Sequence, residues 1–236
     1  MISRRSLCSG AAALPLVAVT DAKTAVADEC AVFTNDRQKS VTLDDAIRML
    51  KEGNERFVAG KSVNCNLLAQ VRATAGGQAP FAAIVGCIDS RVPPELVFDQ
   101  HIGDIFAARI AGNFVNSDII GSLEFATKIA GAKAIVVLGH TECGAIKGAI
   151  DQAKLGNLTK MLENFNPAIE ASKSVAGERS STNKKLVQAV ADTNAKLAAK
   201  MLVDKSDVLR ELVEKKQLVI AAAMHDVGTG KVTFFG

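Results

Sequence analysis

Two separate stretches of the chain carry residue types that bind soft metals. The first contains Cys87, and the second contains His140 and Cys143. Two thiolates and one imidazole suit Zn²⁺, which proteins usually hold tetrahedrally. Three protein ligands leave the fourth position open, as in catalytic zinc sites, whereas a fourth protein ligand would make the site structural. The residue types therefore predict a catalytic zinc centre, provided that the fold brings the two stretches together.

An acidic and a basic residue follow the first cysteine in Cys87-Ile88-Asp89-Ser90-Arg91. Asp89 can act as a fourth ligand that closes the site, or it can pair with Arg91 and leave the fourth position to water. A lone cysteine at a strand end is more often a small buried hydrophobic residue, and one His-x-x-Cys pattern is weak evidence for a metal. The two stretches together are stronger evidence for a metal site than either one alone.

Each stretch follows a short apolar run. Residues 81–87 and residues 134–139 are apolar and short enough to form buried strands. Parallel sheets place functional groups just beyond the carboxyl ends of their strands. We therefore expect Cys87, His140 and Cys143 to meet at one edge of a sheet.

The rest of the chain alternates between strand-like and helix-like segments. This alternation predicts an α/β fold with a mostly parallel sheet flanked by helices. Residues 157–182 are expected as a polar connection or a mobile helix. The expected strands are residues 81–87, 104–109, 134–139, 218–224 and 231–235, and the expected helices are residues 43–57, 117–130, 145–155, 183–202 and 206–215.

Composition excludes several classes of protein. The 236 residues carry a formal charge of +3 and contain neither Trp nor Tyr, which argues against a nucleic-acid partner. With 48% hydrophobic and 22% charged residues, the chain is too apolar to be mainly disordered. No apolar run reaches the ~18 residues of a membrane span. Neither a Gly-x-Gly-x-x-Gly pattern nor a full Gly-x-x-x-x-Gly-Lys-Ser/Thr loop is present, because Gly60-Lys61-Ser62 has Glu55 where that loop needs its first glycine, so nucleotide binding is not expected.

The first residues have the order of an export signal. Arg4 and Arg5 precede an apolar run, and Ala25-Val26-Ala27 resembles a cleavage site. We predict a twin-arginine-type signal and a periplasmic or comparable location, with an uncleaved N-terminus or anchor as the alternative. The expected organisation is a signal peptide over residues 1–27, a polar tether over 28–41 and one catalytic domain over 42–236.

The chain resembles the β-class carbonic anhydrases. The resemblance covers roughly residues 42–236. It rests on residues 87–92 and 139–144, on Arg109 with Gly112-Asn113, on residues 122–126 and on the tail over residues 226–232. It implies a five-stranded sheet whose last strand is antiparallel, and a homodimer or larger homo-oligomer with active sites at the dimer interface.

The same resemblance implies an activity and a role for each site residue. One zinc ion per chain would be held by Cys87, His140 and Cys143, with Asp89 and Arg91 as the catalytic dyad. Gln78 and the backbone N–H of Gly144 would contact the substrate. The implied reaction is reversible hydration of CO₂ to bicarbonate and a proton through zinc-bound hydroxide. Some members of the family close the site by moving the aspartate onto zinc, using a Trp and a Tyr that this chain lacks, so we expect the open form.

Other interpretations stay open. The same metal and fold could hydrolyse carbonyl sulfide or carbon disulfide, or a closed Cys₂HisAsp site could be purely structural. Arg109 is expected to pair at a helix or an interface rather than to bind substrate. Cys30 and Cys65 could form a disulfide in an oxidising compartment, tying the N-terminal tether to the loop before the first strand, or remain free thiols.

Overall fold

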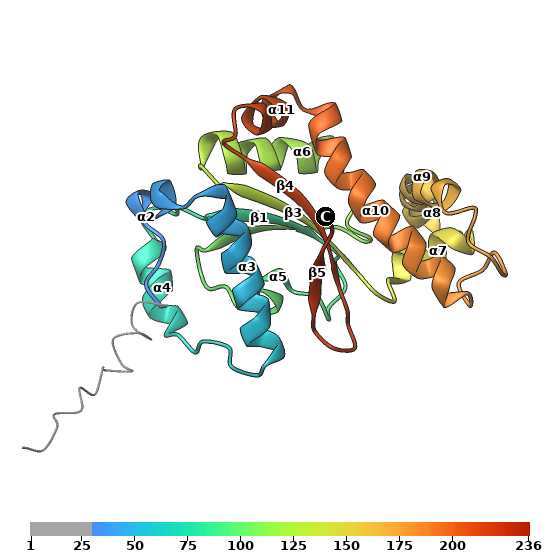
Figure 1. The fold of residues 1–236 in the computed structure, drawn as a ribbon, viewed down its shortest axis with the longest axis horizontal. Helices are drawn as coiled ribbons and strands as arrows, with labels where there is room; N and C mark the ends of the chain where they lie inside the picture. The colour runs from blue at the N-terminus through green and yellow to red at the C-terminus, as the bar shows by residue number, and fades with distance from the viewer. Residues whose placement is uncertain (1–29) are drawn as a thin grey trace, which may run out of the picture.

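The computed structural model describes residues 30–236, so the expected signal peptide lies outside the described residues. One sheet forms the centre of the molecule, with strand order β2-β1-β3-β4-β5 (Figure 1). Strands β1 to β4 run parallel and β5 is antiparallel, which confirms the expected fold class. The strands are β1 Ala82–Gly86, β2 Ile105–Arg109, β3 Ala134–His140, β4 Val219–His225 and β5 Val232–Phe234.

Strands β1 and β3 are neighbours in the interior of the sheet, and each leads into one of the two stretches that contain the expected ligands. Every residue of β1 and β3 is buried, as expected for short apolar strands covered on both faces. β1 pairs with both β2 and β3, so its carboxyl end lies between theirs. The register sets Gly86 of β1 opposite Arg109 of β2, and His140 of β3 opposite His225 of β4.

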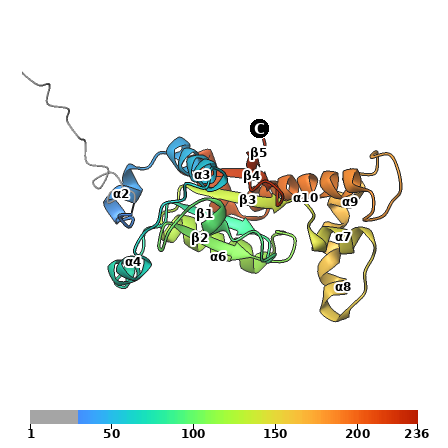
Figure 2. The ribbon, with the colours of Figure 1, turned by 90° about the horizontal axis from the view of Figure 1, so that it is seen from below.

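Helices cover both faces of the sheet, and a separate lobe extends beyond its carboxyl edge (Figures 1 and 2). One face packs against α3 Leu43–Val58 and α5 Pro94–Val97. Helix α2 Asn35–Ser40 precedes them and is attached through Gln38, which donates to the Pro80 and Ala130 carbonyls. The other face packs against α6 Ser117–Glu124, the π-helix η1 Phe125–Ile129, α10 Lys184–Lys205 and α11 Asp207–Glu214. The lobe contains α7 Gly144–Ile150, α8 Gly156–Leu162, the 3₁₀ helix η2 Glu163–Phe165 and α9 Asn166–Ala171. A further short helix, α4 Leu67–Thr74, precedes β1.

The start of α3 shows how local sequence fixes a helix. The Thr42 side chain accepts a hydrogen bond from the Asp45 backbone, and the Asp45 side chain accepts one from the Thr42 backbone. This reciprocal cap satisfies two N–H groups that have no partner inside the helix. Ala46 and Leu50 then face the sheet. The helix agrees with the one predicted over residues 43–57.

One segment differs from expectation. Of residues 28–41, expected as a polar tether, the described residues 30–41 pack on the body of the protein, because Phe33 is buried against Phe81 and the Gln38 side chain donates to the Pro80 carbonyl. Residues 157–182, expected as a polar connection or a mobile helix, contain most of α8 and all of α9, which agrees with the helical alternative. Both helices pack onto α10 or α7 through residues such as Leu162 and Ala168.

The four cysteines within residues 30–236 divide into two groups. Cys30 and Cys65 form a disulfide, so the structure takes the first of the two alternatives that the sequence leaves open. Cys87 and Cys143 are free and buried. Among the described residues, no helix has both the length and the apolar character needed to cross a membrane.

Candidate metal centre

The three expected ligands converge at the carboxyl edge of the sheet. Cys87 directly follows β1, His140 ends β3, and Cys143 caps the start of α7. One ligand atom from each residue lies within 4.8 Å of the other two, and all three residues are buried. Because parallel strands end at the same edge, the alternation of strands and helices is what makes these two distant stretches meet.

The orientation of His140 fits that of a metal ligand. Its Nδ1 atom donates to the Thr141 carbonyl at 2.9 Å, which leaves Nε2 as the nitrogen that can accept. Nε2 is buried and has no hydrogen-bond partner among the described residues. A buried, unpartnered nitrogen beside two thiols is the arrangement that a metal ion would satisfy. Thr141 is itself fixed, because its hydroxyl accepts from the Val227 backbone at 3.0 Å.

The pKa values of the Cys87 and Cys143 thiols move in opposite directions. The pKa of Cys87 is lowered to about 4, chiefly because Cys143 donates a hydrogen bond to its sulfur. His140 and the backbone N–H groups of Gly112 and Asp89 lower the pKa of Cys87 further, against the effect of burial. The pKa of Cys143 is raised because its proton is held by Cys87 and because it is buried. Because metals bind thiolates, a cation at this site would favour loss of the protons from both thiols.

The Cys87 sulfur is anchored by the backbone of a neighbouring loop. The Gly112 N–H donates to Cys87 Sγ at 3.2 Å, and the Gly112 carbonyl accepts from the buried Asn194 side chain of α10 at 2.8 Å. Gly112 has a φ of +75°, and a Cβ on it would lie 2.4 Å from the Phe165 ring. Only glycine fits this position without strain.

Asp89 and Arg91 form a two-point ion pair at the edge of the metal centre. Arg91 Nε donates to Asp89 Oδ1 at 2.9 Å, and Arg91 Nη2 donates to Asp89 Oδ2 at 2.8 Å. These bonds hold the pKa of Asp89 well below its usual range. Asp89 Oδ2 lies 4.0 Å from His140 Nε2, so the carboxylate faces the site while Arg91 occupies both of its oxygens.

A family model described as carbonic anhydrase matches residues 82–232, a range that contains all three candidate ligands and the Asp89–Arg91 pair. The chain belongs to the carbonic anhydrase family. Carbonic anhydrase 2 of Mycobacterium tuberculosis is 46% identical over 114 residues, which are 48% of this chain and 55% of that protein. The carbonic anhydrase of Mycolicibacterium smegmatis is 39% identical over 130 residues, 52% of this chain and 63% of that protein. The chain thus spans only part of the length of the curated relatives that it matches.

Similar solved structures place the chain in the β-class of this family. A β-carbonic anhydrase of Aspergillus fumigatus matches with a TM-score of 0.63 and 27% identity, covering 71% of this chain and 81% of that chain. A tetrameric β-carbonic anhydrase of Sordaria macrospora matches with a TM-score of 0.62 and 27% identity, covering 70% of this chain and 85% of that chain.

Arg109 has a role that was not expected from the sequence. Its Nε donates to the Cys87 carbonyl at 2.8 Å and its Nη2 to the Asp89 carbonyl at 2.6 Å. The side chain therefore fixes the backbone that carries one metal ligand and the carboxylate. Its position at the carboxyl end of β2, beside the end of β1, is the signal that could have revealed this role.

The two predicted substrate contacts lie in different places. Gly144 is the first residue of α7 and follows Cys143. Its backbone N–H is one of the N–H groups in the first turn that have no acceptor inside the helix. Gln78 is exposed and precedes β1, whereas Cys87 follows β1. Because five residues of strand span roughly 17 Å, Gln78 lies at the opposite edge of the sheet from the metal centre. Within one chain, the structure does not bring Gln78 to the ligands.

Proposed function

We propose that this protein catalyses the reversible hydration of carbon dioxide to bicarbonate and a proton, with one zinc ion held by Cys87, His140 and Cys143. The observation that carries this proposal is the buried Cys-His-Cys cluster with the Asp89–Arg91 pair beside it. Zinc in such a site supplies an activated water at neutral pH. Membership of the carbonic anhydrase family supports the choice of substrate.

The residues of the chain have distinct tasks in this reaction. Asp89 remains a carboxylate because Arg91 donates to both of its oxygens, so it can accept a hydrogen bond from the attacking oxygen and orient it toward carbon. Arg91 also keeps Asp89 from becoming a fourth metal ligand, which favours the open site over the closed structural one. The Gly144 N–H at the start of α7 can donate to a substrate oxygen.

A homodimer or larger homo-oligomer is part of this proposal. Gln78 can contact substrate only if a second copy brings it to the metal centre. Two features support such an assembly: β2 lies at the edge of the sheet, and α4 and η1 expose Leu67, Leu68, Phe125 and Ile129. The similar β-carbonic anhydrase of Sordaria macrospora is itself a tetramer.

Export to a periplasm or comparable lumen is a further part of the proposal. Arg4 and Arg5 with the apolar run that follows support it, as does the Cys30–Cys65 disulfide, because disulfides persist in oxidising compartments. The intact mass of protein isolated from its native host tests this part. A mature mass that still includes residues 1–27 would contradict it.

Stopped-flow CO₂ hydration on metal-analysed protein tests the activity. We expect one zinc per chain, loss of zinc in Cys143→Ala, and loss of rate with zinc retained in Asp89→Ala. A parallel assay with carbonyl sulfide separates the two substrate classes. Full zinc content without CO₂ hydration at any pH would reject the proposed function and favour a structural zinc site.

A further inference from the structure

Helix α4 has almost no apolar core of its own. Of its residues Leu67–Thr74, only Gln70 is buried, while Leu67, Leu68 and Val71 are exposed. A helix of this length is unstable without tertiary packing. The position of α4 within its own chain must therefore depend on a small number of specific attachments.

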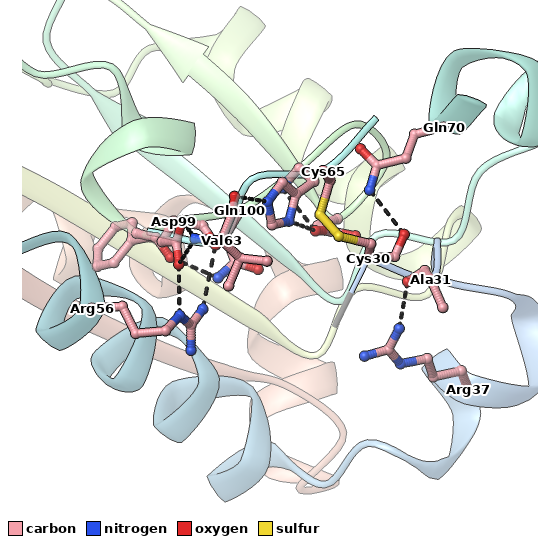
Figure 3. Close-up of polar contacts among 12 residues, drawn as sticks. Cys30, Ala31, Arg37, Arg56, Val63, Cys65, Gln70, Asp99 and Gln100 are labelled. Atoms are coloured by element: carbon pink, nitrogen blue, oxygen red, sulfur yellow. Dashed lines mark hydrogen bonds and ion pairs between the residues drawn. A yellow bond between two sulfur atoms is a disulfide. The ribbon is translucent and has the colours of Figure 1, made fainter. Parts of the chain in front are cut away.

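Two of these attachments lead to the same residue, Cys30 (Figure 3). Cys65, shortly before the helix begins, is bonded to Cys30 through the disulfide. The buried Gln70 amide donates from Nε2 to the Cys30 carbonyl at 3.0 Å. Gln70 Oε1 has no partner among the described residues, so the bond to the Cys30 carbonyl is the one hydrogen bond of this buried amide there. If Cys30 moved away, Gln70 would be buried with no hydrogen bond, which is costly.

The residues on both sides of the disulfide are held by the rest of the fold. On one side, the segment after Cys30 is fixed because the Gln38 side chain donates to the carbonyls of Pro80 and Ala130, each at 2.7 Å. On the other side, the Val63 N–H donates to the Asp99 carboxylate at 3.1 Å, and Asp99 also binds Arg56 (Figure 3). The disulfide therefore joins two anchored segments, with α4 attached to both.

The loop that carries Gln78 extends directly from this helix. Thr74 ends α4 and packs against Gly103, where a Cβ would lie 2.9 Å from the Thr74 methyl carbon. Gln78 follows after Gly76-Gly77 and precedes Pro80, whose carbonyl is held by Gln38. Because the two glycines are intrinsically flexible, the position of Gln78 depends on α4 on one side and on Pro80 on the other.

We propose that the Cys30–Cys65 disulfide positions Gln78, so that the redox state of this bond controls substrate binding at the zinc site of a neighbouring copy. The proposal rests on the proposed function and on the assembly described with it. A dithiol reductant would break the S–S bond, transferring two electrons and two protons to give two thiols while the dithiol becomes a disulfide. Cys30 would then separate from α4, Gln70 would lose its acceptor, and the Gln78 loop would loosen while the metal ligands stay in place.

Kinetics of the Cys30→Ser/Cys65→Ser double variant test the proposal in zinc-loaded, full-length protein. We expect KM for CO₂ to rise about 2- to 10-fold, the size of one lost neutral hydrogen bond, with kcat and zinc content nearly unchanged. The reductant tris(carboxyethyl)phosphine should raise KM of the wild type equally and leave the double variant unchanged. An unchanged KM in the double variant would overturn the proposal.

A second background separates positioning from general stabilisation. In Gln78→Ala, the serine pair should raise KM no further, because the same contact is already lost. An equal additional rise in that background would show that the disulfide acts on KM independently of Gln78, and would overturn the proposal. Sedimentation of each variant confirms that the compared proteins have the same oligomeric state.

Hydrogen exchange provides a readout that does not depend on activity. Amides of residues 67–78 should exchange faster in reduced than in oxidised protein, while those of β3 stay protected. Unchanged exchange of residues 67–78 would refute the proposal even if KM changed. If the wild type is inactive with CO₂ but its residues 67–78 exchange faster on reduction, the proposed function is rejected, whereas the role of the disulfide in holding α4 and the Gln78 loop is supported.

Discussion

The side chain of Asn194 reaches the candidate metal ligand Cys87 through the backbone of one residue, Gly112. Asn194 Nδ2 donates to the Gly112 carbonyl at 2.8 Å, and the Gly112 N–H donates to Cys87 Sγ at 3.2 Å. A helix on one face of the sheet thereby fixes the sulfur at the carboxyl end of β1. Residues that orient ligands in this way contribute to metal affinity although they never touch the metal.

Replacing Asn194 should weaken zinc binding. In Asn194→Ala, Gly112 loses the donor that holds its carbonyl, so the N–H that faces Cys87 is free to turn away. We expect zinc affinity to fall about 10- to 100-fold, as for other residues that orient ligands. Competition with a chromophoric chelator measures this. Lys200→Ala, an exposed position on the same helix, is the control, and equal affinities in the two variants would contradict the prediction.

Adding one methyl group at Gly112 should destabilise the fold. Gly112→Ala combines a positive φ with a contact at 2.4 Å to the Phe165 ring, so we expect a loss of about 2–5 kcal/mol in the free energy of unfolding. Urea unfolding measures it. Gly121→Ala in α6 is the matched control, because a Cβ there meets nothing within 4 Å and alanine favours a helix. Similar unfolding midpoints for both variants would refute the prediction.

The planar fork of Arg91 should matter more than its charge. Arg91→Lys keeps the positive charge but cannot donate to both Asp89 oxygens in the same geometry. We expect kcat/KM for CO₂ hydration to fall about 10-fold while zinc content stays constant. Lys147→Ala removes the partner of the exposed Glu142 near the same edge and should leave kcat/KM unchanged. Full activity in Arg91→Lys would show that charge alone is sufficient.

The disulfide should also contribute directly to stability. It closes a loop with a sequence separation of 35 residues, for which the chain-entropy model gives about 3–4 kcal/mol. The Cys30→Ser/Cys65→Ser variant should lose that amount in urea unfolding at neutral pH. A reducing agent should lower the midpoint of the wild type and not that of the variant. A variant as stable as the oxidised wild type would rule out this contribution.

Burial of Asp104 predicts a pH dependence of stability. Burial raises the pKa of this carboxyl, while the backbone N–H and the side chain of His101 and the charge of Arg37 oppose the shift. A folded pKa above the unfolded value makes the contribution most favourable below about pH 4, and it is lost as pH rises through the folded pKa. Asp104→Asn keeps an acceptor for the His101 N–H. Its stability relative to wild type should therefore increase from pH 4 to pH 7 in urea unfolding, and a constant difference would contradict this.

The sequence predicted which side chains meet at the candidate metal centre, because their chemistry is specific. Few roles other than metal binding suit Cys87, His140 and Cys143 together at the ends of two buried strands, and apolar runs such as β1 and β3 are readily recognised. The class of fold then followed from the order of strands and helices. The resemblance to the β-class added the antiparallel β5, which the structure contains.

Residues that act through long-range hydrogen bonds were not predictable in the same way. Arg109 and Asn194 are ordinary polar residues until the register and the helix packing bring them to Cys87. The segment over residues 30–41 has the composition of a tether, yet Phe33 and Gln38 attach it to residues far along the chain. Pairings of this kind depend on tertiary structure, which local composition does not encode.

Helix α10 links the lobe to the sheet. Its first half, including Leu186 and Val190, packs into the core that contains Cys87 and Cys143, and its second half, including Ala198 and Leu202, packs under the sheet. Because α10 contributes side chains to both cores, unfolding of this helix would expose apolar residues of the lobe and of the sheet together. The lobe and the sheet should therefore unfold as one cooperative unit, and all three candidate metal ligands belong to that same unit.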